Sequence, residues 1–152
     1  MSNEFPSASI GLSPGDVVSV EGCEHWLEGA WLLSELAVPV AAIFFASDAT
    51  LAAAAAPRND LFRLRARDVI VAADAPFVLE DEGTHFERER RLPVALTSFG
   101  DAPELPAREA LFLQYRSLGG DALLVLSSPS GSLVWNGSRA DPRGVERWGT
   151  RV

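Results

Sequence analysis

Apolar side chains recur at every second position in short runs along the chain, and glycine, proline and acidic turn residues separate these runs. A period of two places successive side chains on opposite faces of a β-strand, so the pattern predicts half-buried strands. Residues 61–67 show this alternation clearly, and the β-branched Val17, Val18 and Val20 suit an earlier strand. Residues 40–47 form an uncharged, mainly apolar run, which predicts a central strand.

Turn-forming residues divide the last third of the chain into a predicted antiparallel meander over residues 110–148. Residues 119–120, 129–131 and 136–137 supply the turns, and the last of these pairs, Asn-Gly, is the strongest two-residue hairpin sequence. Residues 80–83 predict a further hairpin, in which the loop has four residues.

Residues 51–56 are compatible with either a helix or a strand. Alanine is the best helix former, but Pro57 ends the run after six residues, which is short for an independent helix. Whichever assignment holds for residues 51–56, the sequence predicts an all-β fold. The expected architecture is a partly open antiparallel barrel or two packed antiparallel sheets, with at most one or two short helical turns. We expect a flexible N-terminal arm over residues 1–14, with docking of Ile10 and Leu12 at its end left open, and a single β-rich domain over residues 15–152.

Residues 25–33 are expected to form one strand with a tryptophan on each face. Trp26 and Trp31 are five positions apart, so alternation sends their indoles to opposite sides. Either both faces are covered or one indole is exposed, unless a bulge at Gly29 brings both inside. Trp26 and Trp31 are therefore the candidate contacts for a protein partner.

Composition narrows the classes of function. The 152 residues carry a formal charge of −8, which argues against a nucleic-acid partner. All 13 basic side chains are arginine, so lysine-dependent chemistry is excluded, and a single cysteine excludes an internal disulfide. No apolar run approaches the length of a membrane span. The N-terminus lacks the basic start of a secretion signal, so we expect a cytoplasmic location.

Three arginines alternate with apolar residues in one predicted strand. Arg63, Arg65 and Arg67 are expected to share its solvent face. There they form the candidate site for a phosphate or carboxylate ligand, which arginine binds through two parallel hydrogen bonds. The alternative is cross-strand pairing with acids such as Glu87 and Glu89. The mixed-charge run around these two acids itself predicts an exposed or edge strand.

Two histidines are the remaining candidates for chemistry. His25 follows Cys23 and Glu24, but successive strand residues point to opposite faces, so the three are not expected to converge on a metal. His85 lies beside an acidic hairpin tip, for which a solvated surface is the simpler interpretation. We expect no metal, no cofactor and no catalytic residue. A small hydrolase with a histidine–carboxylate site at either histidine stays open as an alternative.

Four short motifs resemble a known family. They are Gly15-Asp16-Val17-Val18, Trp26-Leu27-Glu28-Gly29-Ala30, the run from Gly131 to Gly137, and Pro142-Arg143-Gly144-Val145-Glu146. Their order is similar to that of an uncharacterised bacterial β-rich domain family, whose genes often lie beside polyamine-synthase-like and membrane-stress genes. The resemblance covers residues 12–148. It implies a β-rich fold, carries no established activity, and suggests a membrane-linked role by analogy only.

Together these observations favour a non-catalytic accessory module that binds another protein of the same operon or assembly. The absence of lysine, the single cysteine and the lack of a glycine-rich phosphate loop weigh against catalysis. A tryptophan-rich β-surface with exposed edges suits partner binding, and a homo-oligomer is compatible with the same surface. The alternatives are a domain that binds a small anion through the arginine row, and the histidine hydrolase.

Overall fold

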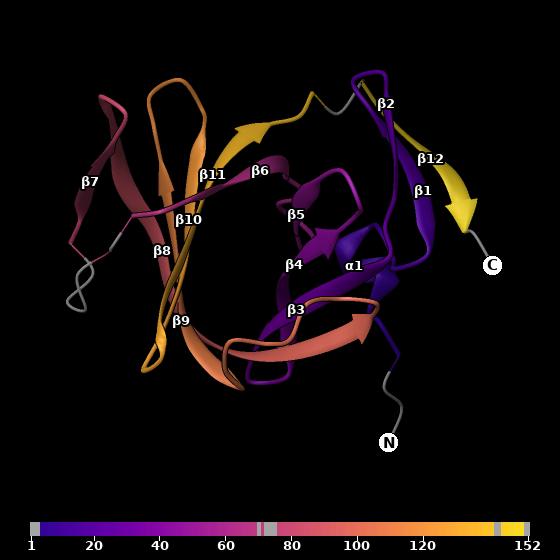
Figure 1. Cartoon of the computed structure of the whole chain (residues 1–152), viewed down its shortest axis with the longest axis horizontal. Helices are drawn as coiled ribbons and strands as arrows, with labels where there is room; N and C mark the ends of the chain where they lie inside the picture. Colours follow the sequence, from indigo (N-terminus) through magenta and orange to yellow (C-terminus); the bar gives the residue numbers. More distant parts are fainter. Residues whose placement is uncertain (1–3, 70, 72–75, 142–143, 151–152) are drawn as a thin grey trace.

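The computed structural model describes residues 4–69, 71, 76–141 and 144–150 (Figure 1). Strands make up 61% of the structure and helix 4%, which confirms the predicted all-β class. The helix seen in these residues falls far short of the length and apolarity that a membrane crossing needs. In chain order the elements are α1 (Ser7–Ile10), β1 (Asp16–Val20), β2 (Cys23–Trp26), β3 (Gly29–Glu35), β4 (Val38–Phe45), β5 (Thr50–Ala54), β6 (Leu61–Arg67), β7 (Val78–Asp81), β8 (Thr84–Gly100), β9 (Glu109–Arg116), β10 (Ala122–Ser128), β11 (Gly131–Arg139) and β12 (Val145–Thr150).

Eight antiparallel strands close into a barrel in the order β3-β4-β5-β6-β11-β10-β9-β8, and pairing of β3 with β8 completes the ring. The long strand β8 makes this closure, because its middle pairs with β9 while residues 95–100 pair with β3. Strand β7 extends the sheet from the first residues of β8. Of the predicted architectures, the structure is therefore a barrel, and this barrel is closed.

The lumen of the barrel is a packed core. Trp31, Phe62 and Trp135 meet in it from three different strands, and the rings of the two tryptophans meet edge to face with centroids 6.4 Å apart. Side chains at alternate positions are just large enough to fill an eight-stranded barrel in this way. The loop between β8 and β9 covers one end, where Ala102 and Leu105 pack against the same core.

The Asn136-Gly137 pair lies inside β11, so the hairpin predicted there is wrong. A Cβ atom at Gly137 would lie 3.2 Å from side-chain atoms of both Phe62 and Leu64 on the paired strand β6. The glycine therefore serves close packing between two strands and not a turn. The other two turns of the predicted meander are confirmed, because β9, β10 and β11 follow one another as antiparallel neighbours.

A three-stranded sheet, β12-β1-β2, packs together with α1 against the outer face of β3, β4 and β5 (Figure 1). Ile10 and Leu12 are buried in this second core beside Phe44. Residues 5–12 are therefore docked, in contrast with the flexible arm expected over residues 1–14, because their apolar side chains displace water from the barrel surface. Strand β12, predicted to close the meander, pairs with β1 instead.

Residues 25–33, predicted as one strand, belong to two different sheets. Strand β2 ends before Leu27, whose backbone N–H donates to the carbonyl oxygen of Asp16 at 2.9 Å as the chain crosses to the barrel. Strand β3 then begins at Gly29, where a Cβ atom would lie 2.4 Å from the backbone of Asp101. Only glycine fits this close approach, so the residue marks the entry to the barrel and not a bulge in a longer strand.

Strand pairing also resolves two other expectations. The open segment 51–56 begins as strand, because β5 pairs with both β4 and β6. The hairpin between β7 and β8 has a two-residue loop, Glu82-Gly83, where four residues were predicted, because Asp81 pairs directly with Thr84. Both loop residues have positive φ, as a type I′ turn requires.

Candidate functional site

Arg65 and Arg67, two members of the predicted arginine row, are held by the turn between β7 and β8. Arg65 Nη2 lies 2.8 Å from Glu82 Oε2, and Arg67 Nη2 lies 3.0 Å from Asp81 Oδ1. The Asp81 side chain is only 4% exposed. The hydrogen bonds from Arg67 hold the pKa of Asp81 below its ordinary value, against the opposing effect of burial. Charge-assisted hydrogen bonds thus fasten this turn to β6.

Arg63, the third member of the row, faces the turn between β1 and β2. Its guanidinium donates to the carbonyl oxygen of Val20 and lies 3.8 Å from Glu21. The row is therefore matched by acids, although not by Glu87 and Glu89, because β6 pairs with β5 and β11 and not with β8. This neutralisation favours the structural interpretation of the row, and its role as an anion site stays a prediction.

The two candidate tryptophans lie in opposite environments. Trp31 is 4% exposed in the lumen, and its Nε1 donates to the carbonyl oxygen of Pro103 at 2.9 Å. A partner cannot reach it without opening the barrel, so the expectation that Trp31 contacts a partner does not fit the structure. Trp26 is 42% exposed on β2, at one edge of the three-stranded sheet. Of the two indoles, only that of Trp26 is presented to solvent.

The two histidines make separate contacts with carboxylates. His25 is buried on β2, and its Nδ1 lies 3.0 Å from Asp48 Oδ1 in the connection between β4 and β5. The hydrogen bond with His25 lowers the pKa of Asp48. The exposed His85 lies 3.9 Å from Glu80, its cross-strand partner. Within the described part of the chain, no three His, Cys, Asp or Glu side chains are placed to hold a metal ion.

A charged cluster that the sequence did not reveal lies at the end of the barrel opposite the β8–β9 loop. Its residues come from the connection between β5 and β6 and from strands β8, β9 and β11. They follow the lumen-facing residues of these strands toward the rim, where the packed core ends. We call the cluster the arginine mouth; it comprises Arg58, Arg90, Arg116 and Arg139 with the carboxylates Asp60 and Glu89.

Two arginines of the mouth are anchored by its carboxylates. Arg139 Nη2 lies 3.0 Å from Asp60 Oδ1, and Arg116 Nη2 lies 3.6 Å from Asp60 Oδ2. Arg116 Nε is also 2.8 Å from Glu89 Oε1, close but not aligned as a hydrogen bond. The side-chain amide of Gln114 donates to the other oxygen of Glu89 at 3.2 Å. This network fixes two guanidinium groups at the rim.

Arg58 and Arg90, the other two arginines of the mouth, form no ion pair with any residue that the structure describes. Arg90 Nη1 is buried and has no hydrogen-bond partner there. Burial lowers the pKa of Arg90 and repulsion from Arg58 lowers it further, while Glu89 and Glu35 act in the opposite direction. The mouth therefore contains two guanidinium groups that form no ion pair with any described residue.

A bulge in β8 shapes the mouth. The register of β8 against β9 shifts between Arg88 and Arg90, so Glu89 is an extra residue on this strand. A bulge re-aims the side chains beside it. Here it lets Glu89 reach Arg116, while Arg90 pairs with the buried Gln114 and keeps its place above the lumen. The alternating charges of residues 87–91 are the one sequence signal of the mouth, but the same alternation is typical of an exposed or edge strand.

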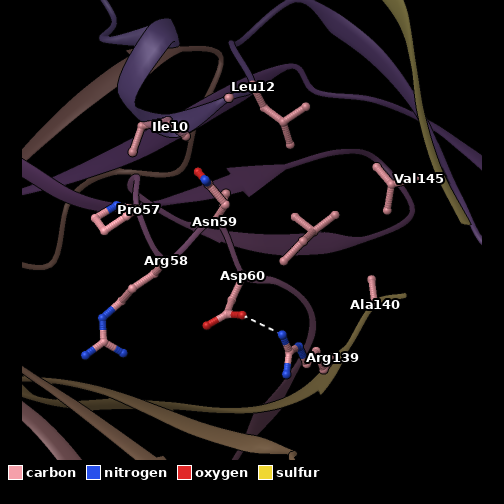
Figure 2. Close-up of a pocket in the computed structure, with 12 residues that line it drawn as sticks. Ile10, Leu12, Pro57, Arg58, Asn59, Asp60, Arg139, Ala140 and Val145 are labelled. Carbon is pink, nitrogen blue, oxygen red and sulfur yellow. Dashed lines mark ion pairs between the residues drawn. The ribbon is translucent and has the colours of Figure 1, made fainter. Parts of the chain in front are cut away.

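A pocket of about 480 Å³ opens beside the mouth (Figure 2). Arg58, Asp60 and Arg139 form its charged side, and Figure 2 shows the ion pair that joins the last two. Ile10 and Leu12 lie on the side away from these charges. The pocket thus joins the rim of the barrel to the core beneath the three-stranded sheet.

The resemblance to a bacterial β-rich domain family stays a prediction, and residues 142–143 of its last motif lie outside the described residues. Comparison of the chain with protein-family models, with curated protein sequences and with solved structures finds no match.

Proposed function

We propose that this protein is a non-catalytic, cytoplasmic binding module whose arginine mouth holds a small anion, either a carboxylate or a phosphate. The observation that carries the proposal is the pair of guanidinium groups, Arg58 and Arg90, that form no ion pair with any residue the structure describes. The chain as a whole has 21 acidic and 13 basic side chains. The exposed Arg91 and Arg108 also form no ion pair among the described residues, but of these four arginines Arg90 alone has a buried nitrogen atom without a hydrogen-bond partner there. An anionic ligand would satisfy that nitrogen.

The charge of the mouth suits an anion. Four arginines and two carboxylates give the mouth a net charge of +2. The net charge is +1 if Glu35, which attracts Arg90 electrostatically, is counted as well. Guanidinium groups bind planar oxyanions through two parallel hydrogen bonds. Because Asp60 already orients Arg116 and Arg139, less side-chain freedom is lost when a ligand binds.

The packing of the barrel restricts the ligand to the rim. Trp31 and Trp135 fill the lumen, and the β8–β9 loop covers the far end. A ligand therefore meets the mouth from solvent and does not enter the barrel. Sites built on the loops and strand ends of a rigid barrel are a common arrangement for small-molecule binding.

Thermal unfolding in the presence of phosphate tests the proposal. The melting temperature should rise in a saturable way, with a stabilisation of about 2.7 kcal/mol at 100 times the dissociation constant. Arg90→Met removes the buried charge and should abolish this effect. Arg65→Gln removes an exposed arginine that is paired with Glu82, and it serves as the matched control, in which the effect should persist. Equal stabilisation of both variants would reveal a general salt effect and reject the site.

Partner binding is a second candidate, favoured by the position of β2. This strand is an edge of the three-stranded sheet and carries the exposed Trp26. An extended segment of another protein from the same operon, or of a second copy of the chain, would add a strand at such an edge. Trp26→Ser should then abolish capture of the partner, measured by affinity purification and mass spectrometry, and leave the phosphate effect unchanged.

A further inference from the structure

We infer that the anion bound at the arginine mouth carries an alkyl tail, which occupies the pocket between the β5–β6 connection, the N-terminal segment and β12 (Figure 2). The inference rests on the proposed anion site and names its ligand class: a monocarboxylate with an apolar chain. Two features of the pocket carry it, the apolar wall and the charge at its opposite side.

The apolar wall comes from three parts of the chain. Ile10 and Leu12 belong to α1 and the loop after it, Leu61 begins β6, and Val145 begins β12. Figure 2 shows Ile10, Leu12 and Val145 on the side away from the charged residues. All four side chains belong to the core between the barrel and the three-stranded sheet. The volume of about 480 Å³ lies within the usual range of ligand pockets, roughly 300–1,000 Å³.

The opposite side of the pocket carries a single net positive charge. Asp60 Oδ1 lies 3.0 Å from Arg139 Nη2, so these two residues neutralise each other, and Arg58 forms no ion pair among the described residues. Asp60 also lies 3.6 Å from Arg116 Nη2, which joins the pocket to the rest of the mouth. One unmatched cation beside an apolar wall fits one negative head group and not a polyanion.

An anion without a tail would leave Leu61 and Val145, the partly buried residues of the apolar wall, in contact with water. Each CH₂ group that moves from water to such a wall contributes about 0.8 kcal/mol, which corresponds to about fourfold tighter binding. A ligand whose head lies at Arg58 and whose chain extends toward Leu12 and Val145 uses both sides of the pocket.

A series of carboxylates measures this dependence directly. Isothermal titration calorimetry of the full chain with acetate, butanoate, hexanoate and octanoate should show about fourfold tighter binding for each added CH₂, until the pocket is full. The uncharged 1-octanol has the tail without the charge, and it should bind at least about tenfold more weakly than octanoate, since a hydrogen bond to a charged group is stronger than a neutral one.

Two variants fill the pocket. Val145→Phe and Ala53→Leu each add bulk to its wall, so octanoate should bind these variants no more tightly than acetate does. Val145 is only partly buried, so its variant is expected to fold even if the substitution at the buried Ala53 prevents folding. Leu133→Phe makes a similar enlargement at an exposed position of β11 outside the pocket, and it should keep the full dependence on chain length.

The outcomes separate the tail from the anion site. Acetate could bind, with Arg90→Met abolishing that binding, while affinity does not change with the length of the carboxylate chain. This outcome would overturn the inference of an alkyl tail and leave the proposed anion site supported. Failure of phosphate and of every carboxylate to bind would overturn the proposed function and the tail together. Octanoate binding that survives Arg58→Gln combined with Arg90→Met would show an apolar pocket without anion recognition, which also overturns the inference.

Discussion

Asp81→Asn is expected to lower the free energy of unfolding by about 2 kcal/mol, because it removes the charge that Arg67 contacts. Arg67 donates to the Asp81 carboxylate from Nε at 3.1 Å and from Nη2 at 3.0 Å, and the two side chains are 23% and 4% exposed. A hydrogen bond to a charged group contributes about 1.5–3 kcal/mol and a neutral one about 0.5–1.5 kcal/mol. Asparagine keeps one acceptor, and Glu82 remains 3.1 Å from Arg67, so the loss is smaller than that of an isolated buried pair.

Urea denaturation at pH 7 measures the effect of Asp81→Asn. A loss of about 2 kcal/mol corresponds to a fall in melting temperature of about 4–8 °C for a chain of this length. A double-mutant cycle with Arg67→Gln isolates the pair, and we expect a coupling energy of about 1–2 kcal/mol. Arg65→Gln is the matched control, since its exposed pair with Glu82 should contribute only about 0–1 kcal/mol.

The difference between Asp81→Asn and the unaltered protein should also depend on pH. The pKa of Asp81 in the folded protein lies below the ordinary value of 3.8. The stabilisation is therefore fully present above pH 3.8 and is lost as the pH falls through the pKa of the folded state. A difference that persists unchanged in strong acid, or an Asp81→Asn protein that is as stable as Arg65→Gln, would refute the anchoring role and reopen the row as an anion site.

Three further predictions concern single side chains. Gly29→Ala places a methyl group 2.4 Å from the Asp101 backbone, so it should lower the free energy of unfolding, measured by urea denaturation, by more than about 3 kcal/mol. The added methyl group of Gly137→Ala meets only side chains, at 3.2 Å, so the loss should be about 1–2 kcal/mol. His25→Ala removes a buried side chain and its contact with the exposed Asp48, and it should cost about 1–2 kcal/mol. His85→Ala should change stability by less than about 0.5 kcal/mol. Phosphate should stabilise both histidine variants as it stabilises the unaltered protein, and loss of that effect in a folded His25→Ala protein would place His25 in the site.

The strands could be predicted because alternation is a local property. In β6, Phe62 packs into the lumen while Arg65 faces solvent, as the period of two requires. The prediction of a turn at Asn136-Gly137 is wrong for an equally physical reason. A glycine after asparagine suits a hairpin, but it also suits a position where a second strand needs the space of a Cβ atom. Only the pairing of β11 with β6 decides between the two, and pairing is not a local property.

The arginine mouth could not be predicted, because closure of the barrel brings its members together. Arg58, Arg90, Arg116 and Arg139 lie in four separate segments, and no pattern within any one segment connects it to the others. The pairing of β3 with β8 that closes the ring is a long-range contact. The bulge at Glu89 has no local signature either, since alternating charge is also typical of an ordinary exposed strand.

Ion pairing divides the arginines of this protein into two groups. Arg67, Arg116 and Arg139 lie within 3.0 Å of a carboxylate, and in doing so they hold separate segments of the chain together. Among the described residues Arg58 and Arg90 have no such carboxylate, and neither do the exposed Arg91 and Arg108, although the chain has more acidic than basic side chains. Arg58 and Arg90 lie at the rim, where the lumen-facing rows meet solvent and a ligand can approach without disturbing the packed core. The fold thus supplies two oriented guanidinium groups and two unmatched ones, and the charge of a ligand is the simplest way to complete the set.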